Sequence, residues 1–425
     1  MSAARTTWRV ARTSRWTQIA RFYGSAAARP VLVPVDGAPT AFDPIFLRDA
    51  CACDKCVDPS SKQKRRTTAQ TPPDVRAEAV RAAPDGTVLV DFASGVDGAH
   101  RHTGVYPADF LRTYSSPRAR FDHRWGFPVP EVYWEQATLG QHLVDVDFDA
   151  YMADDGVLRQ FLLGLYSTGL AFVSNVPAQE RLADGQIAVE AIGRRIGYIK
   201  NTFYGPSWNV ISQPGAKNIA YTSENLGLHM DLLYYESPPG VQLLHCIANN
   251  ADGGESVYAD AFRAAYVLAE RDRAAFDLLA SFPITFHYKN DGQHYAFTRP
   301  LFEVDPANGP AETGRPVPRL RSVNYSPPFQ APFDHLGTEF AAFRAAFAAF
   351  EAVIASPAQQ YETRFAPGQC AVFFNRRVLH SRREFRLRPA PSPAPADSRA
   401  AGRWLKGTYL DIDSFYSKLR VLCGM

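Results

Sequence analysis

Residues 224–235 of the chain, "ENLGLHMDLLYY", place one histidine, His229, two positions before one aspartate, Asp231. The residues around them are apolar or aromatic, so the segment reads as a buried β-strand. Because residues i and i+2 of a strand point to the same face, the two side chains can converge on one point. The two side chains either hydrogen-bond each other within a core or bind a metal ion together. Other parts of the chain help to distinguish these alternatives.

The segments around this stretch predict a mostly β fold with flanking helices. A run of 19 residues, "LRQFLLGLYSTGLAFVSNV", predicts a helix, a glycine stop and a strand. In "EFAAFRAAFAAFEAVIA", four phenylalanines fall on one helical face, which favours core packing. Many short strands with turn signals indicate a β-sandwich or barrel rather than a parallel sheet. They are predicted in "LGLHMDLLYY", "PGVQLLHCIA", "FPITFHYKN", "RLRSVNYS", "QCAVFFNRRVLHS" and "RWLKGTYLDID".

The composition is that of a soluble globular protein. Of the 425 residues, 46% are hydrophobic, 21% charged and 12% aromatic. No stretch approaches 18 uninterrupted apolar residues, so we expect no membrane-spanning helix. The formal net charge of +3 depends on the six arginines of residues 1–30 and becomes −3 without them. The charge therefore gives no reason to expect a nucleic-acid partner.

Residues 1–30 have the composition of a mitochondrial transit peptide. They are rich in Arg, Ser, Thr and Ala and contain no acidic residue, which is typical of such leaders. The stretch "RFYGSA" is a plausible cleavage region. The alternative is a flexible basic tail on a cytoplasmic protein.

Three cysteines crowd into the hexapeptide "CACDKC", within a strand-rich region that spans residues 31–125. A disulfide between such close cysteines would be strained, whereas three thiolates suit one tetrahedral Zn²⁺ ion. The fourth ligand would come from "AHRHTG", as His100 or His102. Three unliganded buried thiols are the alternative to this structural zinc site. The cysteines are Cys51, Cys53 and Cys56.

A metal at His229 and Asp231 needs a further ligand. Two histidines and one carboxylate form the facial triad of non-haem Fe(II) oxygenases. His380 ends an apolar run that reads as a buried strand, and it is the favoured third ligand on spacing. The remaining candidates are His245, His287 and His294.

An arginine would suit a dicarboxylate co-substrate, since its planar guanidinium grips a carboxylate at two points. Arg403 begins a strand-like run after the Pro/Ala-rich loop 389–402, which we expect to be exposed. Five other arginines that follow His380 read as surface or loop charges. They are Arg382, Arg383, Arg386, Arg388 and Arg399.

From about residue 31 to its C-terminus, the chain resembles the γ-butyrobetaine and trimethyllysine dioxygenases. These are Fe(II)- and 2-oxoglutarate-dependent hydroxylases of the TauD/TfdA type. The resemblance rests on "LRDACACDKC", "TFYGPSW", "NIAYTSENLGLHMD", "PPGVQLLHC", "VLHSRREF" and "GTYLDID", which occur in the family's order. A zinc domain fused to an oxygenase core is an unusual combination, so the likeness is specific.

The resemblance implies a double-stranded β-helix (jelly-roll) core over residues 135–425, preceded by the zinc-binding domain. It implies hydroxylation of a quaternary ammonium acid by a homodimer that uses Fe(II), Zn(II), 2-oxoglutarate, O₂ and ascorbate. Arg403 matches the arginine that grips 2-oxoglutarate. The iron ligands it implies are His229, Asp231 and His380, and the zinc ligands are Cys51, Cys53, Cys56 and His102. The matching aromatic cage for the trimethylammonium group is Tyr204, Trp208, Tyr221 and Tyr409.

Asn218 favours γ-butyrobetaine, because an amide at this position suits the substrate's carboxylate, whereas the trimethyllysine enzymes carry an acidic residue. Two features point the other way. The family's next asparagine contact is replaced by Ser326, with Asn324 two residues earlier, and a transit-like N-terminus suits a trimethyllysine dioxygenase. A more remote alternative is a catalytically inactive interaction protein.

Overall fold

The computed structural model describes residues 29–94, 100–211, 222–305, 317–333, 337–389, 395 and 397–425. The chain divides into two compact units, Met1–Arg124 and Trp125–Met425, each with its own hydrophobic core. Almost all of the expected transit peptide lies outside the described residues, as do Asn218 and Tyr221.

The first unit is rich in strands, as the sequence predicts. A two-stranded and a three-stranded antiparallel sheet enclose a core that includes Val33, Leu47 and Val90. Residues 107–114, "PADFLRTY", contain helix α3. The strands are β1 (Val31–Val35), β2 (Ala38–Phe42), β3 (Arg76–Ala82), β4 (Val88–Ser94) and β5 (His100–Tyr106). The helices are α2 (Pro44–Asp49), η1 (Thr68–Gln70), α3 (Ala108–Tyr114) and α4 (Pro117–Trp125).

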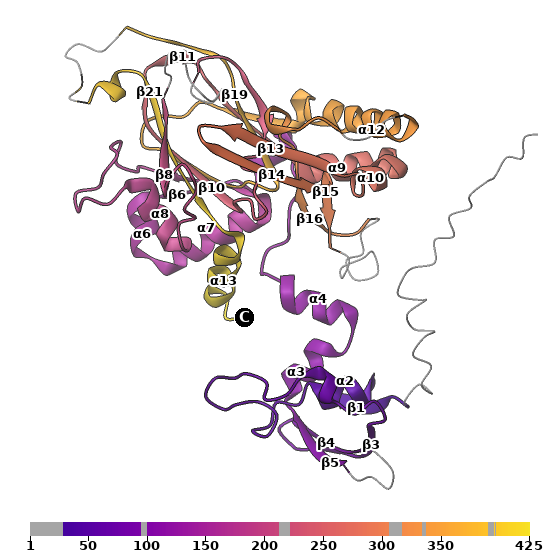
Figure 1. Ribbon diagram of the computed structural model, residues 1–425. Coiled ribbons are helices and arrows are strands. Elements are labelled where there is room, and N and C mark those ends of the chain that lie inside the picture. Colours follow the sequence, from indigo (N-terminus) through magenta and orange to yellow (C-terminus); the bar gives the residue numbers. More distant parts are fainter. Residues whose placement is uncertain are drawn as a thin grey trace, which may run out of the picture. The chain divides into compact units, whose positions relative to one another are not determined.

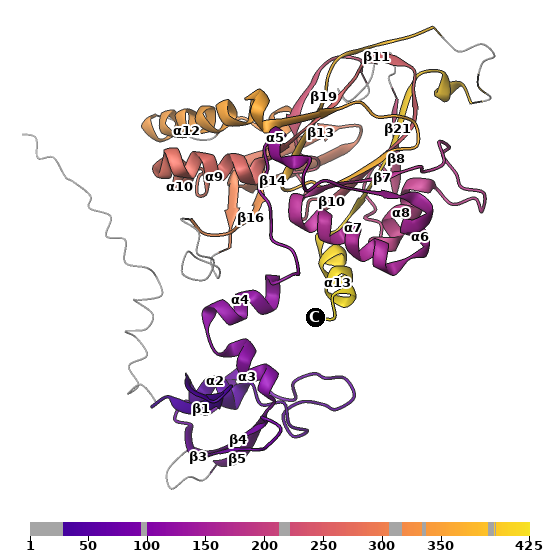
Figure 2. The same ribbon diagram turned by 180° about the vertical axis from the view of Figure 1, so that it is seen from behind.

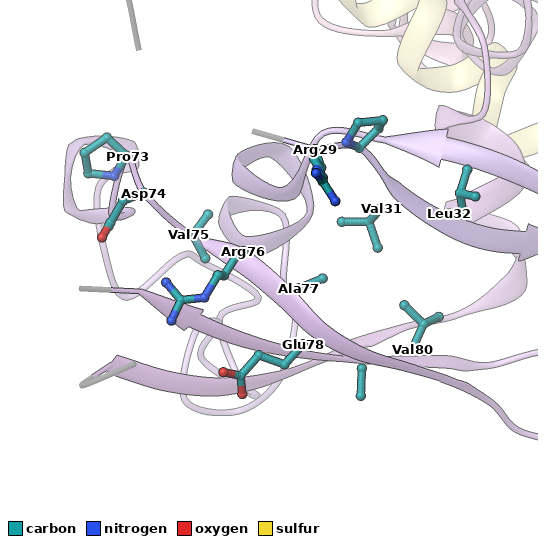
Figure 3. Close-up of a pocket in the computed structure, with 12 residues that line it drawn as sticks. Arg29, Val31, Leu32, Pro73, Asp74, Val75, Arg76, Ala77, Glu78 and Val80 are labelled. Carbon is teal, nitrogen blue, oxygen red and sulfur yellow. The ribbon is translucent and has the colours of Figure 1, made fainter. Parts of the chain in front are cut away.

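A groove of about 760 Å³ lies in the first unit, between the start of β1 and strand β3 (Figure 3). Both strands are at the edges of their sheets, which explains the opening between them. Leu32 is 61% exposed beside this groove, while Val31 and Val75 are buried in the core beneath it. None of the predicted metal-, co-substrate- or substrate-binding residues lines this groove.

The second unit contains two larger sheets among the described residues. The first has the strand order β6-β7-β18-β10-β21-β8 and is antiparallel except for the β6–β7 pair. The second has the order β17-β12-β19-β9 and is antiparallel throughout. The six strands are β6 (Val144–Asp147), β7 (Leu170–Ser174), β8 (Ser207–Ile211), β10 (Val241–Asn249), β18 (Cys370–Phe374) and β21 (Arg403–Leu410). The four are β9 (Leu226–His229), β12 (Ser256–Asp260), β17 (Gln360–Thr363) and β19 (Val378–Arg382).

Apolar side chains such as Phe172, Tyr258 and Phe373 join the two sheets. Two faces packed through one core, with helices outside, are the arrangement expected of a jelly roll. Three two-stranded sheets complete the strands of this unit. They are β11 (Ala251–Gly253) with β20 (Phe385–Leu387), β13 (Ile284–Asn290) with β14 (Gln293–Arg299), and β15 (Phe302–Val304) with β16 (Leu320–Val323).

Helices cover this β core in two groups, which Figures 1 and 2 show from opposite sides. One group is α6 (Phe148–Ala153), α7 (Asp155–Thr168), α8 (Ala188–Ile196) and α13 (Ile412–Leu422), which pack with the six-stranded sheet. The other is α9 (Ala261–Arg271), α10 (Arg273–Leu279) and α12 (Thr338–Ile354), which pack together. The remaining short helices are α5 (Gln136–Leu139), η4 (Pro327–Phe329), η5 (Pro357–Gln359) and η6 (Ser398–Ala401).

Several predicted elements are confirmed. Helix α7 ends at Gly169, whose φ of 74° is the left-handed conformation that glycine adopts at helix ends, and β7 follows. On α12, Phe343 and Phe350 are buried and Phe340 and Phe347 pack beside them, which confirms the apolar face. No helix in the described parts of the chain combines the length and apolar character needed to cross a membrane.

Two strand predictions differ from the structure. The strand expected over residues 224–235 is shorter, because β9 ends at His229 and Asp231 lies in the loop beyond it. The single strand expected over "QCAVFFNRRVLHS" is two strands, β18 and β19, which belong to different sheets. A polar turn, Asn375–Arg377, lies between them, and its side chains bond to Pro239, to Ser322 of β16 and to Asp260 at the end of β12.

Candidate active site

Two neighbouring strands bring the three predicted iron ligands together. His229, the last residue of β9, is the direct partner of His380 on β19, and their ring centroids are 4.2 Å apart. Asp231 lies beside both, with its Oδ1 3.3 Å from Nε2 of His229 and its Oδ2 3.9 Å from Nε2 of His380. One donor atom from each residue lies within 4.8 Å of the others.

The surroundings of these side chains suit a divalent metal. Nδ1 of His229 lies 2.8 Å from the carbonyl oxygen of Gly227, which favours a proton on Nδ1 and leaves Nε2 as a lone-pair donor. Burial lowers the pKa of His380 to about 3, so this imidazole is neutral. Burial disfavours a charge on Asp231, but its bond with His229 and the nearby His380 hold its pKa well below the usual range. The set therefore offers nitrogen and anionic oxygen donors.

A cavity of about 80 Å³ contains these three residues together with Arg403. Arg403 is the first residue of β21 and only 4% exposed. Its guanidinium lies over the ring of Phe385 and 3.5 Å from the carbonyl oxygen of Gly254, and its buried Nε has no hydrogen-bond partner among the described residues. A buried, incompletely bonded guanidinium fits a carboxylate ligand.

The Pro/Ala-rich loop before Arg403 is closed at its base. The side-chain amide of Asn250 donates to the carbonyl oxygens of Pro389 and Ala401, at 3.0 and 2.9 Å. Residues 390–394 and 396, inside this loop, lie outside the described part of the chain. Because its two ends are tied to the same side chain, the additional length does not shift Arg403 from the start of β21.

Three of the four predicted cage aromatics form one surface next to Asp231. The rings of Trp208 and Tyr409 stack at 4.0 Å, and Tyr204 lies 6.4 Å from Trp208. A Cβ on Gly407 would lie 2.5 Å from the Trp208 indole, so the glycine lets the indole lie flat on β21. The Tyr409 hydroxyl also donates to Asp231 Oδ2 at 2.6 Å, and burial and this carboxylate raise the pKa of Tyr409 well above its ordinary value.

In the first unit, His102 lies against the three cysteines, while His100 is exposed. Its Nε2 is 3.2 Å from Sγ of Cys51, 3.8 Å from that of Cys53 and 3.7 Å from that of Cys56. Burial, with the nearby charges of arginine and lysine, lowers the pKa of His102 to about 4, so its ring is neutral. Three sulfurs and one neutral imidazole nitrogen fit a closed tetrahedral zinc site.

Comparison with protein families agrees with this geometry. Residues 131–409 match the family described as "Taurine catabolism dioxygenase TauD, TfdA family", and residues 32–112 match "Gamma-butyrobetaine hydroxylase-like, N-terminal". The chain belongs to the TauD/TfdA dioxygenase family. It is an enzyme, a 2-oxoglutarate-dependent dioxygenase.

Curated relatives align over most of the chain. Dioxygenase str8 of Strobilurus tenacellus is 35% identical over 89% of this chain and 84% of its own. The γ-butyrobetaine dioxygenase of Pseudomonas sp. (strain AK-1) is 30% identical over 91% of this chain and 92% of its own. The mitochondrial trimethyllysine dioxygenase of Rattus norvegicus is 28% identical over 90% of this chain and 82% of its own.

Sequence reasoning missed Arg382 in this TauD/TfdA site. It was grouped with surface charges, yet it is 5% exposed and lines the same cavity as Arg403. Its guanidinium donates to the carbonyl oxygen of Glu224 and lies over Phe385. Since Arg382 is two residues after His380 on one strand, the alternation of strand side chains would have placed both on one face.

The other arginines after His380 agree with the prediction. Arg383 is paired with Glu362, Arg388 with Asp252, and Arg399 with Asp397 and Glu180. Arg386 is exposed. The alternative histidines are not grouped with Asp231 among the described residues. They are His245, buried on β10, and His287 and His294 on the β13–β14 hairpin.

Ser326 and Asn324 differ in whether their side-chain polar atoms are hydrogen-bonded within the fold. The Asn324 amide donates to the carbonyl oxygen of Pro300 and to Glu303, and it accepts a bond from Arg376. Its polar atoms are therefore engaged within the fold. Ser326 is 1% exposed, and its hydroxyl has no partner among the described residues.

Sequence reasoning also missed an aromatic cluster beside the predicted cage. Phe203, the neighbour of Tyr204, is 5.1 Å from Tyr288 and 5.5 Å from Tyr295 on the β13–β14 hairpin. Tyr234, three residues after Asp231, stacks 5.3 Å from Tyr288. A strand was predicted in "FPITFHYKN", but the packing of the β13–β14 hairpin against the loop after Asp231 could not be seen from the sequence.

Proposed function

We propose that this dioxygenase hydroxylates γ-butyrobetaine at C3 to give L-carnitine. The supporting observation is the convergence of His229, Asp231 and His380 beside an aromatic surface and a buried arginine. The γ-butyrobetaine dioxygenase among the relatives agrees with this choice. The protein is then an Fe(II)-dependent hydroxylase of a quaternary ammonium acid.

His229, Asp231 and His380 hold Fe(II) in this proposal, and Arg403 pairs with the distal carboxylate of 2-oxoglutarate. Bound Fe(II) and 2-oxoglutarate together supply the oxidant for one C–H bond, with O₂ consumed and succinate and CO₂ released. The contribution of the chain is to hold these groups and the substrate in a fixed geometry, which selects the bond that reacts. Ascorbate serves as an external reductant.

The trimethylammonium end of the substrate contacts the surface formed by Tyr204, Trp208 and Tyr409. Such a group donates no hydrogen bond, and aromatic faces attract it through their π-electrons. Of the other predicted contacts, Tyr221 completes the aromatic cage, and Asn218 binds the carboxylate of the substrate. Ser326, with its unpartnered buried hydroxyl, is a candidate for a further contact.

A second candidate substrate is trimethyllysine. The mitochondrial trimethyllysine dioxygenases among the relatives favour it, as does the basic, acid-free composition of residues 1–30. The same composition leads us to propose that the protein is mitochondrial and that residues 1–30 are a transit peptide, with a cytoplasmic location as the alternative.

The remaining parts have structural roles in this proposal. Residues 31–125 form a domain stabilised by one zinc ion on Cys51, Cys53, Cys56 and His102, and residues 135–425 form the jelly-roll dioxygenase domain. A zinc site without an open position contributes folding free energy rather than catalysis. The active protein is a homodimer.

Product analysis by mass spectrometry tests the function. Purified protein is incubated with Fe(II), ascorbate, 2-oxoglutarate and O₂, with γ-butyrobetaine and trimethyllysine in parallel, and a His229→Ala variant serves as the control. We expect carnitine with equimolar succinate from the wild type and neither from the variant. Hydroxytrimethyllysine instead would select the second substrate, and absence of both products would refute both substrates.

A further inference from the structure

The carboxylate ligand of the proposed iron site is not held by a sheet. Strand β9 ends at His229, and Asp231 lies two residues further on. Leu232, next in the chain, has a φ of 59°, in the left-handed region that non-glycine residues adopt rarely. The backbone therefore turns at Leu232, directly after Asp231, and hydrogen bonds other than strand pairing must fix the Asp231 backbone.

The side chain of Asn375 makes this connection. Its Oδ1 accepts a hydrogen bond from the backbone N–H of Asp231 at 2.8 Å, and its Nδ2 donates to the Asp231 carbonyl oxygen at 2.9 Å. The same Nδ2 donates to the carbonyl oxygen of Pro239 at 3.1 Å. The amide thus bonds both backbone groups of Asp231, as a neighbouring strand would, across 144 positions in sequence.

Asn375 is itself firmly held. It is completely buried, and its backbone N–H donates to the carbonyl oxygen of Gly240 at 3.0 Å. The next two residues, Arg376 and Arg377, anchor the turn on both sides. Arg377 bonds both carboxylate oxygens of the buried Asp260, at 3.2 and 2.8 Å, and Arg376 bonds Glu303 at 3.0 Å.

Strand β19 follows this turn directly, and His380 on β19 is five residues after Asn375. The segment formed by the Asn375–Arg377 turn and β19 therefore positions two of the three proposed ligands. His380 belongs to its strand, and Asp231 is hydrogen-bonded to the side-chain amide of Asn375. The Tyr409 hydroxyl fixes only the carboxylate end of Asp231. Asn375 bonds both the N–H and the carbonyl oxygen of the Asp231 backbone, while the preceding Met230 N–H donates to the carbonyl oxygen of Tyr325.

We propose that Asn375 is a positioning residue that sets the location of Asp231 relative to His380 and thereby the affinity of the metal site. This inference rests on the proposed iron site. Groups that orient metal ligands typically change metal affinity 10- to 100-fold when they are removed. Asn375 touches neither metal nor substrate in this role.

Binding of Mn(II), the divalent ion next to Fe(II) in the affinity order of the first-row metals, tests the proposal in the full chain. Free Mn(II) is measured by electron paramagnetic resonance for the wild type, Asn375→Ala and Asn249→Ala. The control is matched, because the Asn249 amide also bonds a distant backbone carbonyl, that of Phe365 at 2.7 Å, on the same β core. Thermal unfolding without metal is recorded for all three proteins.

We expect Asn249→Ala to bind Mn(II) as the wild type does and Asn375→Ala to bind it about 10- to 100-fold more weakly. Equal affinity of the two variants would overturn the role of Asn375. If the wild type binds no more Mn(II) than a His229→Ala variant, the proposed metal site fails instead. The two failures are therefore distinguishable.

Hydrogen exchange in the metal-free wild type provides a second test that needs no variant. Because the Asp231 N–H is bonded to a fully buried side chain, we expect it to exchange as slowly as amides in the centre of β10, although it lies in a loop. Exchange of the Asp231 amide at the rate of an exposed loop would overturn the inference. Because this measurement uses the wild type alone, it remains decisive even if Asn375→Ala does not fold.

Discussion

The Gly407→Ala substitution tests how the aromatic surface is built. Gly407 on β21 is the direct partner of Trp208 on β8, and an added Cβ would lie 2.5 Å from Cζ2 and 2.7 Å from Cε2 of the indole. Ordinary contacts begin near 3.4 Å, so the indole must move by about 1 Å. Overpacking of this kind typically costs about 1–3 kcal/mol of unfolding free energy.

The displacement also separates Trp208 from Tyr409, whose rings stack at 4.0 Å. Loss of one aromatic face weakens binding of a trimethylammonium ligand by about 0.5–2 kcal/mol, which is roughly a 2- to 30-fold increase in the dissociation constant. We expect both effects in one variant, because the same ring movement causes them.

Urea unfolding gives the stability change, and calorimetric titration with γ-butyrobetaine in the presence of Mn(II) and 2-oxoglutarate gives the affinity. Gly140→Ala is the matched control, since a Cβ there meets nothing within 4 Å and its φ is −56°. We expect this control to stay within about 0.5 kcal/mol of the wild type. A Gly407→Ala protein as stable as the control, with unchanged affinity, would refute the stacked arrangement of Trp208 on β21.

Three further variants address the other groups. Arg403→Lys keeps the charge but loses the planar fork, so the 2-oxoglutarate dissociation constant in an anaerobic titration should rise about 10- to 100-fold, and a change no larger than that of the exposed Arg383→Lys would contradict the assigned role. Cys56→Ser should lower zinc, measured by elemental analysis, from one ion per chain and make the first unit sensitive to protease; unchanged zinc content would argue against the cluster as a zinc site. Burial lowers the pKa of His245 to about 4 from 6.5, so the unfolded state binds the extra proton first, and the free energy of unfolding should fall as the pH decreases from 6.5 to 4, by at most about 1.4 kcal/mol per pH unit. His245→Leu should flatten that part of the urea-derived stability profile, and an unchanged slope would mean that His245 does not titrate in this range.

Much of the local structure follows from the sequence. The strand and helix patterns predicted α7, β7, α12 and β21, because alternation and helical spacing indicate which faces are buried. The proposed metal ligands were also predicted, from residue chemistry and spacing together with the family resemblance, which selected His380 and His102 among the alternatives. Their grouping in the structure agrees with that prediction.

Predictions from strand alternation and residue type were wrong where the chain leaves regular structure. Alternation along a strand brought His229 and Asp231 to one face in the prediction, but β9 ends at His229. Asp231 reaches the same point through a loop that the side chain of Asn375 holds. Arg382 was misjudged because charged side chains are mostly exposed. Strand alternation places it on the face of His380, but the sequence does not show that this face borders a cavity.

From the sequence by itself we could predict two histidines, a carboxylate and an arginine as the groups that carry the chemistry of this dioxygenase, with a separate cysteine cluster. Among the alternatives, the family resemblance selected His380 and Arg403. The tertiary structure alone decided how they are held. Asn375 and Tyr409 reach Asp231 from 144 and 178 positions away. Such contacts depend on how the two sheets and the turn between them pack, and a local pattern of residues cannot predict which distant side chains will meet.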